Sequence, residues 1–239
     1  MNICIRMTQL AIFGLSAALV CLVGQAAAAP TGSPADTAIR VLSAAGVNAT
    51  KPEAAIWKKA PATQITLQPA FQSYVSIVGT AVTKRVTVQA VRSGGRLFIK
   101  LTWRAPTASS AIKDTTQFVD AVAVEFPITG KAATSPFMGD ESHAVNIWYW
   151  SAEGHIQNLF AKGFGTTTIE PLADLHSAAV RTGRGWAVVF VRPLRVGPDE
   201  GVNLQGRGSI PVAFAVWNGA NRERDGKKAV TLEWQQLRF

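Results

Sequence analysis

Alternating apolar and polar residues predict a β-hairpin in the first half of the chain. Apolar side chains occupy every second position over 85–91, and a second run with the same period covers 96–104. A period of two residues is typical of a strand with one buried face. Ser93, Gly94 and Gly95 separate the two runs, and glycines at this position favour a tight turn. We therefore expect the two runs to pair.

Five more segments have the length and composition of strands, and several of them are apolar on both sides, as inner strands are. No fixed-period repeat and no alternation of strands with helices is visible. These features predict an all-β fold, a single-domain antiparallel β-sandwich with short helical and loop insertions. A short helix is expected over Pro34–Ala45, and Lys51–Ala70 is expected to cross the surface irregularly. The five segments are Phe118–Phe126, Ala144–Ser151, Gly185–Arg192, Ile210–Trp217 and Lys228–Leu237.

Composition supports a folded, strand-rich chain. Of 239 residues, 48% are hydrophobic and 16% are charged, which excludes a disordered tail, a coiled coil and a collagen-like chain. Lysine and arginine number 24 against 15 acidic residues, a formal charge of +9. No dense basic run is present, so no nucleic-acid partner is expected. The positive charge is better suited to docking an acidic protein.

The N-terminal segment predicts export. Arg6 is its only charge, an apolar run follows over Leu10–Val23, and small residues lead to Pro30. This order is typical of a signal peptide, which we assign to residues 1–28, with cleavage near Ala28 and a mature domain over 29–239. The apolar run is short for a span of about 20 residues. We expect a periplasmic protein with no membrane span in its mature form.

Cleavage would also remove both cysteines, Cys4 and Cys21. Without cysteine, the mature chain forms no disulfide, no thiolate metal site, no iron–sulfur cluster and no covalent CxxCH haem attachment. Met1 and Met7 leave as well, so Met138 becomes the sole methionine.

Other candidate chemistry is weak. No nucleophile elbow accompanies the three scattered histidines, which argues against a hydrolase. Asp140 and Glu141 lie near His143, but a solvated loop fits them better than a metal site. Gly201–Gly208 lacks the strand-to-helix context of a phosphate loop. The mixed charges of Arg222–Asp225 indicate a solvated turn.

The run Trp148-Tyr149-Trp150 has three interpretations. Trp148 and Trp150 share one side of a strand, which favours core packing or the wall of a cofactor pocket. Stacking of sugars on the indoles is the third, less favoured interpretation.

Six ordered segments, within a region running from about Trp57 to the C-terminus, resemble a known family. That family is the haem-binding γ subunit of ethylbenzene dehydrogenase, dimethylsulfide dehydrogenase, chlorate reductase and selenate reductase, periplasmic molybdenum enzymes of the dimethyl sulfoxide reductase group. The segments are FVDAVAVEFP (118–127), PFMGD (136–140), VNIWYW (145–150), GWAVVFVRPL (185–194), VAFAVWNG (212–219) and RDGKKAVTLEW (224–234).

The resemblance implies one non-covalent haem b with a methionine and a lysine as axial ligands. The methionine falls on Met138. The lysine falls on Lys228, three residues before Thr231, with the adjacent Lys227 as the alternative. A thioether is a soft ligand that favours ferrous iron. The lysine must bind as the free amine, and burial disfavours its ammonium form.

The resemblance also implies a role in electron transfer. The chain would pass electrons between the iron–sulfur β subunit of a complex, whose α subunit holds the molybdenum cofactor, and a soluble c-type cytochrome. With both axial positions filled, the haem has no open position for substrate, so no catalysis by this chain alone is expected. Alternative hypotheses are a carbohydrate-binding β-sandwich module, a free-standing periplasmic b-type cytochrome and a structural subunit without haem.

Overall fold

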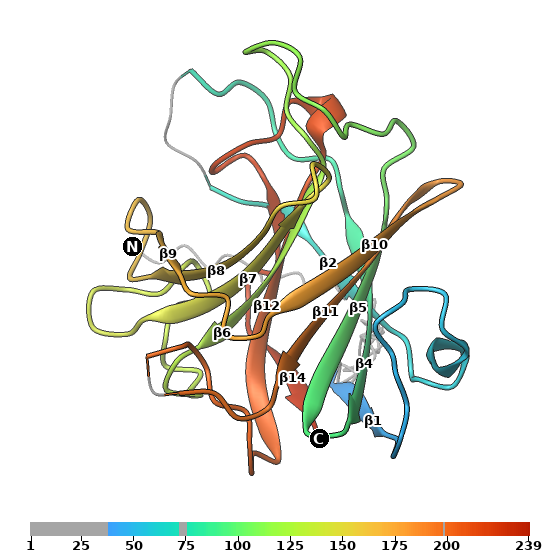
Figure 1. Ribbon diagram of the computed structural model, residues 1–239. Coiled ribbons are helices and arrows are strands. Elements are labelled where there is room, and N and C mark those ends of the chain that lie inside the picture. Colours follow the sequence, from blue (N-terminus) through green and yellow to red (C-terminus); the bar gives the residue numbers. More distant parts are fainter. Residues whose placement is uncertain (1–37, 72–75, 198) are drawn as a thin grey trace, which may run out of the picture. The chain divides into compact units, whose positions relative to one another are not determined.

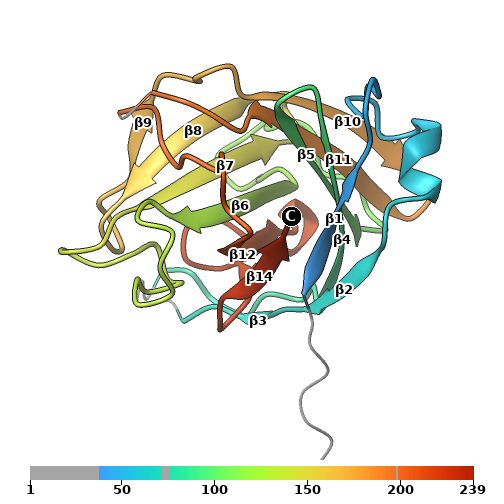
Figure 2. The same cartoon turned by 90° about the horizontal axis from the view of Figure 1, so that it is seen from below.

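A single mixed sheet of 14 strands dominates the part of the chain that the computed structural model describes, residues 38–71, 76–197 and 199–239. The sheet order is β10-β11-β5-β4-β1-β14-β12-β6-β7-β8-β9, with β2 pairing β4 and β13 joining β12 to β3. Figures 1 and 2 show the sheet curled so that two parts face each other. We call β10, β11, β5, β4 and β2 the β5 half, and β12, β13, β6, β7, β8 and β9 the β7 half. The predicted signal peptide lies outside the described residues.

The elements have the following bounds. The strands are β1 Ile39–Ser43, β2 Thr63–Thr66, β3 Gln68–Pro69, β4 Arg85–Ser93, β5 Arg96–Arg104, β6 Ala121–Pro127, β7 Val145–Ser151, β8 Ile156–Ala161, β9 Thr168–Glu170, β10 His176–Thr182, β11 Gly185–Pro193, β12 Ser209–Trp217, β13 Ala229–Val230 and β14 Gln235–Arg238. Two 3-10 turns, η1 Ala55–Lys58 and η2 Gly219–Asn221, interrupt the loops.

The predicted hairpin is confirmed. Strands β4 and β5 pair antiparallel from Val86 opposite Trp103 to Ser93 opposite Arg96. Gly94 and Gly95, with φ of 55° and 73°, form the two-residue connection. Positive φ at both positions matches the twist of the flanking strands and suits glycine.

Alternation along β6 and β7 sends different side chains to the two faces of the β7 half. The larger apolar residues of β6, and Trp148 and Trp150 of β7, join the main core between the two halves of the sheet. The residues between them, Ala123 and Ile147 among them, belong to a separate cluster on the outer face. Side chains on both faces of these strands are therefore buried, as their largely apolar composition predicts.

A polar network in the core joins the two halves. Asn146 Oδ1 accepts hydrogen bonds from Arg192 Nη1 at 2.8 Å and from Trp148 Nε1 at 3.1 Å. Arg192 is fully buried, and its other Nη donates to the carbonyl of Glu200. Hydrogen bonding is what makes burial of this guanidinium tolerable.

Three sequence-based expectations are wrong. The described part of Pro34–Ala45 is strand β1, which pairs in parallel with both β4 and β14, so the sheet is mixed. A short apolar run is compatible with a helix or a strand. Here the segment is a strand because its backbone pairs with both β4 and β14. Lys51–Ala70 contains η1, β2 and β3, and Trp57 is buried against the outer face of the β5 half. The final predicted strand, Lys228–Leu237, is divided into β13 and β14.

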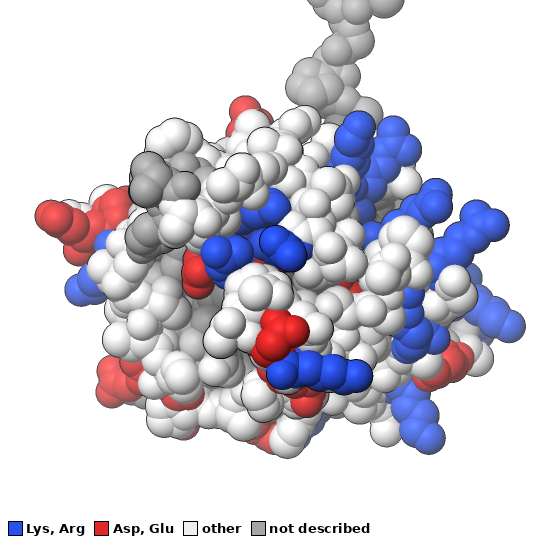
Figure 3. Space-filling view, turned by 90° about the horizontal axis from the view of Figure 1, so that it is seen from above, with Lys and Arg blue, Asp and Glu red and all other residues white. Residues whose placement is uncertain are grey.

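Charge is unevenly distributed over the surface. In the view of Figure 3, Lys and Arg side chains gather on one side, whereas Asp and Glu lie mostly on the other. Within the described residues, no helix has the length and hydropathy needed to cross a membrane.

Replacing Trp148 by alanine should lower the free energy of unfolding by about 3–5 kcal/mol, because this fully buried ring would leave a cavity in the core. Urea denaturation followed by circular dichroism measures the change. Tyr149→Ala is the matched control on the outer face and should cost clearly less. Equal losses for the two variants would contradict the assignment of Trp148 to the core.

Candidate functional site

A cavity of about 1130 Å³ lies against the outer face of the β7 half. Its floor consists of side chains from β6, β7, β8 and β12. Ala121, Ala123 and Ala215 occupy the centre, where Ala123 pairs with both Tyr149 and Ala215 across the strands. Methyl groups leave open space above the sheet, whereas larger residues in these positions would fill it. The small residues of β6 thus make room for a ligand.

Loops form the walls of the cavity. They include the segment around Phe118, the loop that carries Met138, the turn at Phe164–Gly165 and the connection Glu223–Lys228. Trp217 and Tyr149 meet edge to face on the floor, with ring centroids 5.6 Å apart. The site is therefore an apolar floor with a few polar groups directed into it.

Met138 is held by hydrogen bonds on both sides of its backbone. Its N–H donates to Glu125 Oε1 at 3.2 Å, and its carbonyl accepts from Gly163 N at 2.7 Å. The residue adopts φ of 65°, a conformation that costs free energy for a side chain with Cβ. The next residue must be glycine, because a Cβ on Gly139 would lie 2.5 Å from the carbonyl oxygen of His143. The loop is thus built to place one side chain.

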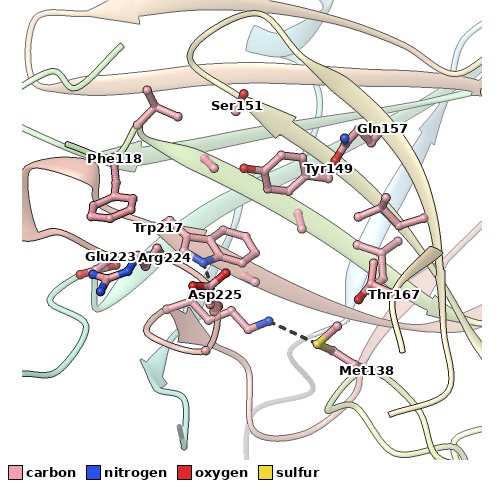
Figure 4. Close-up of a pocket in the computed structure, with 18 of the residues that line it drawn as sticks. Phe118, Met138, Tyr149, Ser151, Gln157, Thr167, Trp217, Glu223, Arg224 and Asp225 are labelled. Carbon is pink, nitrogen blue, oxygen red and sulfur yellow. Dashed lines mark hydrogen bonds between the residues drawn. The ribbon is translucent and has the colours of Figure 1, made fainter. Parts of the chain in front are cut away.

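Lys228 and Met138 line the cavity side by side. Its Nζ lies 3.6 Å from Met138 Sδ, as the dashed line in Figure 4 shows, and 5.1 Å from the ring centroid of Trp217. The side chain is buried, and burial lowers the pKa of Lys228, with the nearby carboxyls of Glu125 and Asp225 opposing the shift. A buried amine with a lowered pKa gives up its proton more readily and exposes its lone pair.

Lys227 points elsewhere. Its Nζ donates to the carbonyls of Asn221 at 2.7 Å and Val78 at 3.1 Å. These bonds fasten the loop after η2 to the segment around Val78. Adjacent lysines at the start of β13 thus have different surroundings, and only Lys228 lines the cavity.

Glu125 is the acidic group beneath the pair. It lines the cavity floor on β6, and burial raises its pKa to about 8, with Lys228 and the hydrogen bond from Met138 N opposing the shift. A carboxyl in this position supports Met138 through a hydrogen bond. It also brings a negative charge near Lys228 when it is ionised.

Glu125→Gln should change how the stability of the cofactor-free protein depends on pH. The pKa of Glu125 is near 4.5 in the unfolded chain and about 8 in the folded chain. Stability from this group is therefore fully present below pH 4.5 and is lost as the pH rises through 8. Unfolding free energies measured across that range should fall less in Glu125→Gln than in the parent. Parallel curves for the two proteins would contradict this prediction.

Several candidates from the sequence have other roles. Trp148 and Trp150 lie in the main core, so the core-packing interpretation is confirmed, and the interpretations as a cofactor wall or a sugar platform are wrong. On β7 it is Tyr149, on the opposite face, that lines the cavity. His143 hydrogen-bonds Asp140 at 2.8 Å, and no group of three metal-binding side chains occurs among the described residues.

The turn Arg222–Asp225 is not simply solvated. Glu223 is buried and accepts hydrogen bonds from Val82 N at 2.8 Å and Asn218 N at 2.9 Å. Backbone donors replace water around this carboxylate, which charge patterning alone does not reveal.

Sequence reasoning missed the residues that shape the cavity. Glu125, Tyr149, Trp217 and the floor alanines were not singled out. The sequence does contain a signal for this floor. Alanine alternates with valine over 121–124, so one face of the strand carries only small side chains.

The fold and the site define a β-sandwich protein with a large pocket lined by a thioether and a buried amine. The family model described as ethylbenzene dehydrogenase matches residues 54–182. The chain is 57% identical to chlorate reductase subunit gamma of Ideonella dechloratans over 98% of both chains. It is 35% identical to a putative respiratory nitrate reductase heme subunit of Haloferax mediterranei, covering 79% of this chain and 68% of that protein.

Two further similarities complete the comparison. Dimethylsulfide dehydrogenase subunit gamma of Rhodovulum sulfidophilum is 36% identical, over 62% of this chain and 58% of its own length. Among solved structures, a family 9 carbohydrate-binding module of Caldicellulosiruptor kristjanssonii superposes with a TM-score of 0.48 at 11% identity, covering 83% and 92% of the two chains. The chain belongs to the ethylbenzene dehydrogenase family, and it aligns with gamma subunits rather than with catalytic subunits.

Proposed function

We propose that the cavity binds one haem b without a covalent bond, with Met138 and Lys228 as axial ligands, and that the chain is the electron-transfer subunit of a molybdenum oxidoreductase. The observation that carries the proposal is the juxtaposition of a thioether and a buried amine 3.6 Å apart in a cavity of about 1130 Å³. The name of one relative, a heme subunit, supports the same cofactor.

The residues present fit a haem. The thioether of Met138 is a soft donor suited to haem iron, and the free amine of Lys228 would be the second donor. The two atoms now lie 3.6 Å apart, and outward rotation of both side chains would open the space between them. The alanine floor leaves space for a flat ring, and the segment 29–239 has no cysteine for covalent attachment.

Each side chain has a distinct task. A haem held there carries one electron at a time as its iron alternates between the ferrous and ferric states. The thioether of Met138 favours the ferrous state, and the bonds from its backbone to Glu125 and Gly163 keep it in place. Lys228 occupies the opposite side as the free amine. The largely apolar floor excludes water from that side of the site.

The partners follow from the relatives. The names of two of them describe subunits of larger enzymes, which supports a complex over a free-standing cytochrome. In this proposal the chain exchanges electrons with an iron–sulfur β subunit, which is connected to the α subunit that holds the molybdenum cofactor. A soluble c-type cytochrome is the second redox partner.

Met138→Leu should preserve packing while removing the sulfur ligand. Protein purified from haem-supplied cells should show a sharp Soret band and α and β bands when reduced. We expect the variant to show an altered reduced spectrum and a reduction potential lower by on the order of 0.1 V, within the roughly 0.8 V that axial ligands control. A colourless parent protein would refute the haem, and an unchanged spectrum in the variant would refute the methionine ligand.

Lys228→Ala and Lys227→Ala form a matched pair. Lys228→Ala should change the spectrum of the bound haem, because it removes the amine that faces Met138. Lys227→Ala should leave the spectrum unchanged and lower thermal stability, because it removes two hydrogen bonds to backbone carbonyls. If only Lys227→Ala altered the spectrum, the assignment of the ligand would be reversed.

Export to the periplasm is part of the proposal. The segment 1–28 should be removed, so protein recovered from the periplasm of a bacterial host should begin at Ala29. Intact mass and N-terminal sequencing measure this. Ala28→Arg should slow processing, because signal cleavage requires small residues before the cut. Full-length protein with an intact Met1–Ala28 segment in the periplasm would contradict cleavage.

A further inference from the structure

Basic residues are concentrated in one part of the fold. Residues 38–71, 76–105 and 176–197, which supply the β5 half with β1 and the segment packed on it, contain 14 lysines and arginines and a single acidic residue, Glu53. The remaining described residues contain nine basic and 13 acidic side chains. The positive charge of the chain is therefore a property of one half of the sheet, and the half that carries the cavity is slightly acidic.

One end of the β5 half carries four exposed cations, which we call the basic rim: Lys84, Arg85, Arg104 and Arg184. Arg104 of β5 lies opposite Gly185 of β11, the residue after Arg184. Val86 of β4, the residue after Arg85, pairs with Trp103 of β5, the residue before Arg104. The four side chains make no ion pair with any described residue, whereas Arg96 elsewhere on β5 pairs with Asp174 at 2.5 Å. Figure 3 shows Lys and Arg gathered on one side of the molecule.

An unpaired cluster of like charges has a cost. Like charges on neighbouring strands destabilise a sheet, and neighbouring strands lie only about 4.8 Å apart. A counter-charge supplied by a partner would remove that cost and would also steer the encounter between the two molecules.

The basic rim lies directly outside an aromatic cluster. Trp103 and Trp186, next to Arg104 and Gly185 in the sequence, each contact Trp150 edge to face, with centroid distances of 6.2 and 5.1 Å. Trp150 belongs to β7, whose neighbouring residues Tyr149 and Ser151 line the cavity on the other side of the strand. The sheet of the β5 half, one layer of packed indole rings and strand β7 therefore lie between the basic rim and the cavity.

We propose that the basic rim is the docking surface for an acidic redox protein that exchanges electrons with the cavity through this aromatic layer. The electron exchange rests on the proposed function, whereas the docking itself does not require a haem. A protein is favoured over a polyanion such as DNA, because the rim offers four cations, on β4, on β5 and just before β4 and β11, whereas a DNA-binding protein can make six to ten phosphate contacts.

The probe is a plant-type [2Fe–2S] ferredoxin, a small acidic redox protein. At low ionic strength the parent protein should bind it, and Arg85→Glu/Arg104→Glu should weaken binding by roughly tenfold or more. Lys131→Glu/Lys162→Glu reverses two exposed cations of the β7 half and changes the net charge equally. This control should stay within about twofold of the parent. Circular dichroism verifies that both variants are folded.

Electron exchange supplies a second measurement. One electron leaves the reduced cluster of the ferredoxin and reaches the ferric haem, with no other reactant. The second-order rate of haem reduction, followed by stopped-flow absorbance, should fall in Arg85→Glu/Arg104→Glu in parallel with binding. Binding and rate should both decline as salt rises. Colourless protein would refute the proposed function, while the binding measurement would still decide the docking surface.

Three outcomes would overturn this inference. Equal weakening by the two double variants would show that net charge alone matters. Unchanged ferredoxin binding in Arg85→Glu/Arg104→Glu would place docking elsewhere. Binding of duplex DNA or of phosphatidylglycerol vesicles through the same residues, with no binding of ferredoxin at the same ionic strength, would identify a different class of partner.

Discussion

Strands β6 and β7 are largely apolar on both faces, and the core and the cavity are arranged on either side of them. Their larger side chains, Trp148 foremost, close the core between the two halves of the sheet. Their other face forms the floor of a cavity, where alanines keep the space open and Tyr149 and Trp217 border it. Polar groups on a strand that borders two compartments need partners, because an unpaired polar group on either face would be costly. Asn146 has Arg192 and Trp148 in the core, and Glu125 has the N–H of Met138 on the cavity side.

Hydrogen bonds to the backbone hold the segments that carry Met138 and Lys228, in addition to side-chain packing. Met138 adopts a positive φ and is bonded through both its N–H and its carbonyl. On the other side, Lys227 and Glu223 fasten the loop that leads to Lys228. Positioning of this kind reduces the reorganisation that accompanies binding and a change of charge.

The two halves of the sheet differ in electrostatics as well as in structure. The half with the cavity combines acidic and basic residues, while residues 38–71, 76–105 and 176–197, which include the β5 half, contain Glu53 as their single acidic residue. Such an asymmetry gives the molecule an electric dipole, so partners of opposite charge would approach different sides. The tryptophan cluster behind Arg104 connects these two sides physically.

Much of the fold could be predicted from the sequence because strand alternation is a local property. The hairpin of β4 and β5, the inner strands and the all-β class follow from the period of two, and the resemblance to gamma subunits follows from ordered local segments. The sequence alone also brought Met138 and two adjacent lysines to attention. Only the tertiary structure decided that Ile39–Ser43 is a strand, since its partners are distant strands. The resemblance already favoured Lys228 over Lys227, but only the tertiary structure placed Lys228 in the lining of the cavity and Lys227 outside it. Likewise, only the tertiary structure buried Glu223 and placed Glu125 beside Met138 and Lys228. Each of these depends on which distant groups surround a side chain, and neighbours in sequence do not determine that.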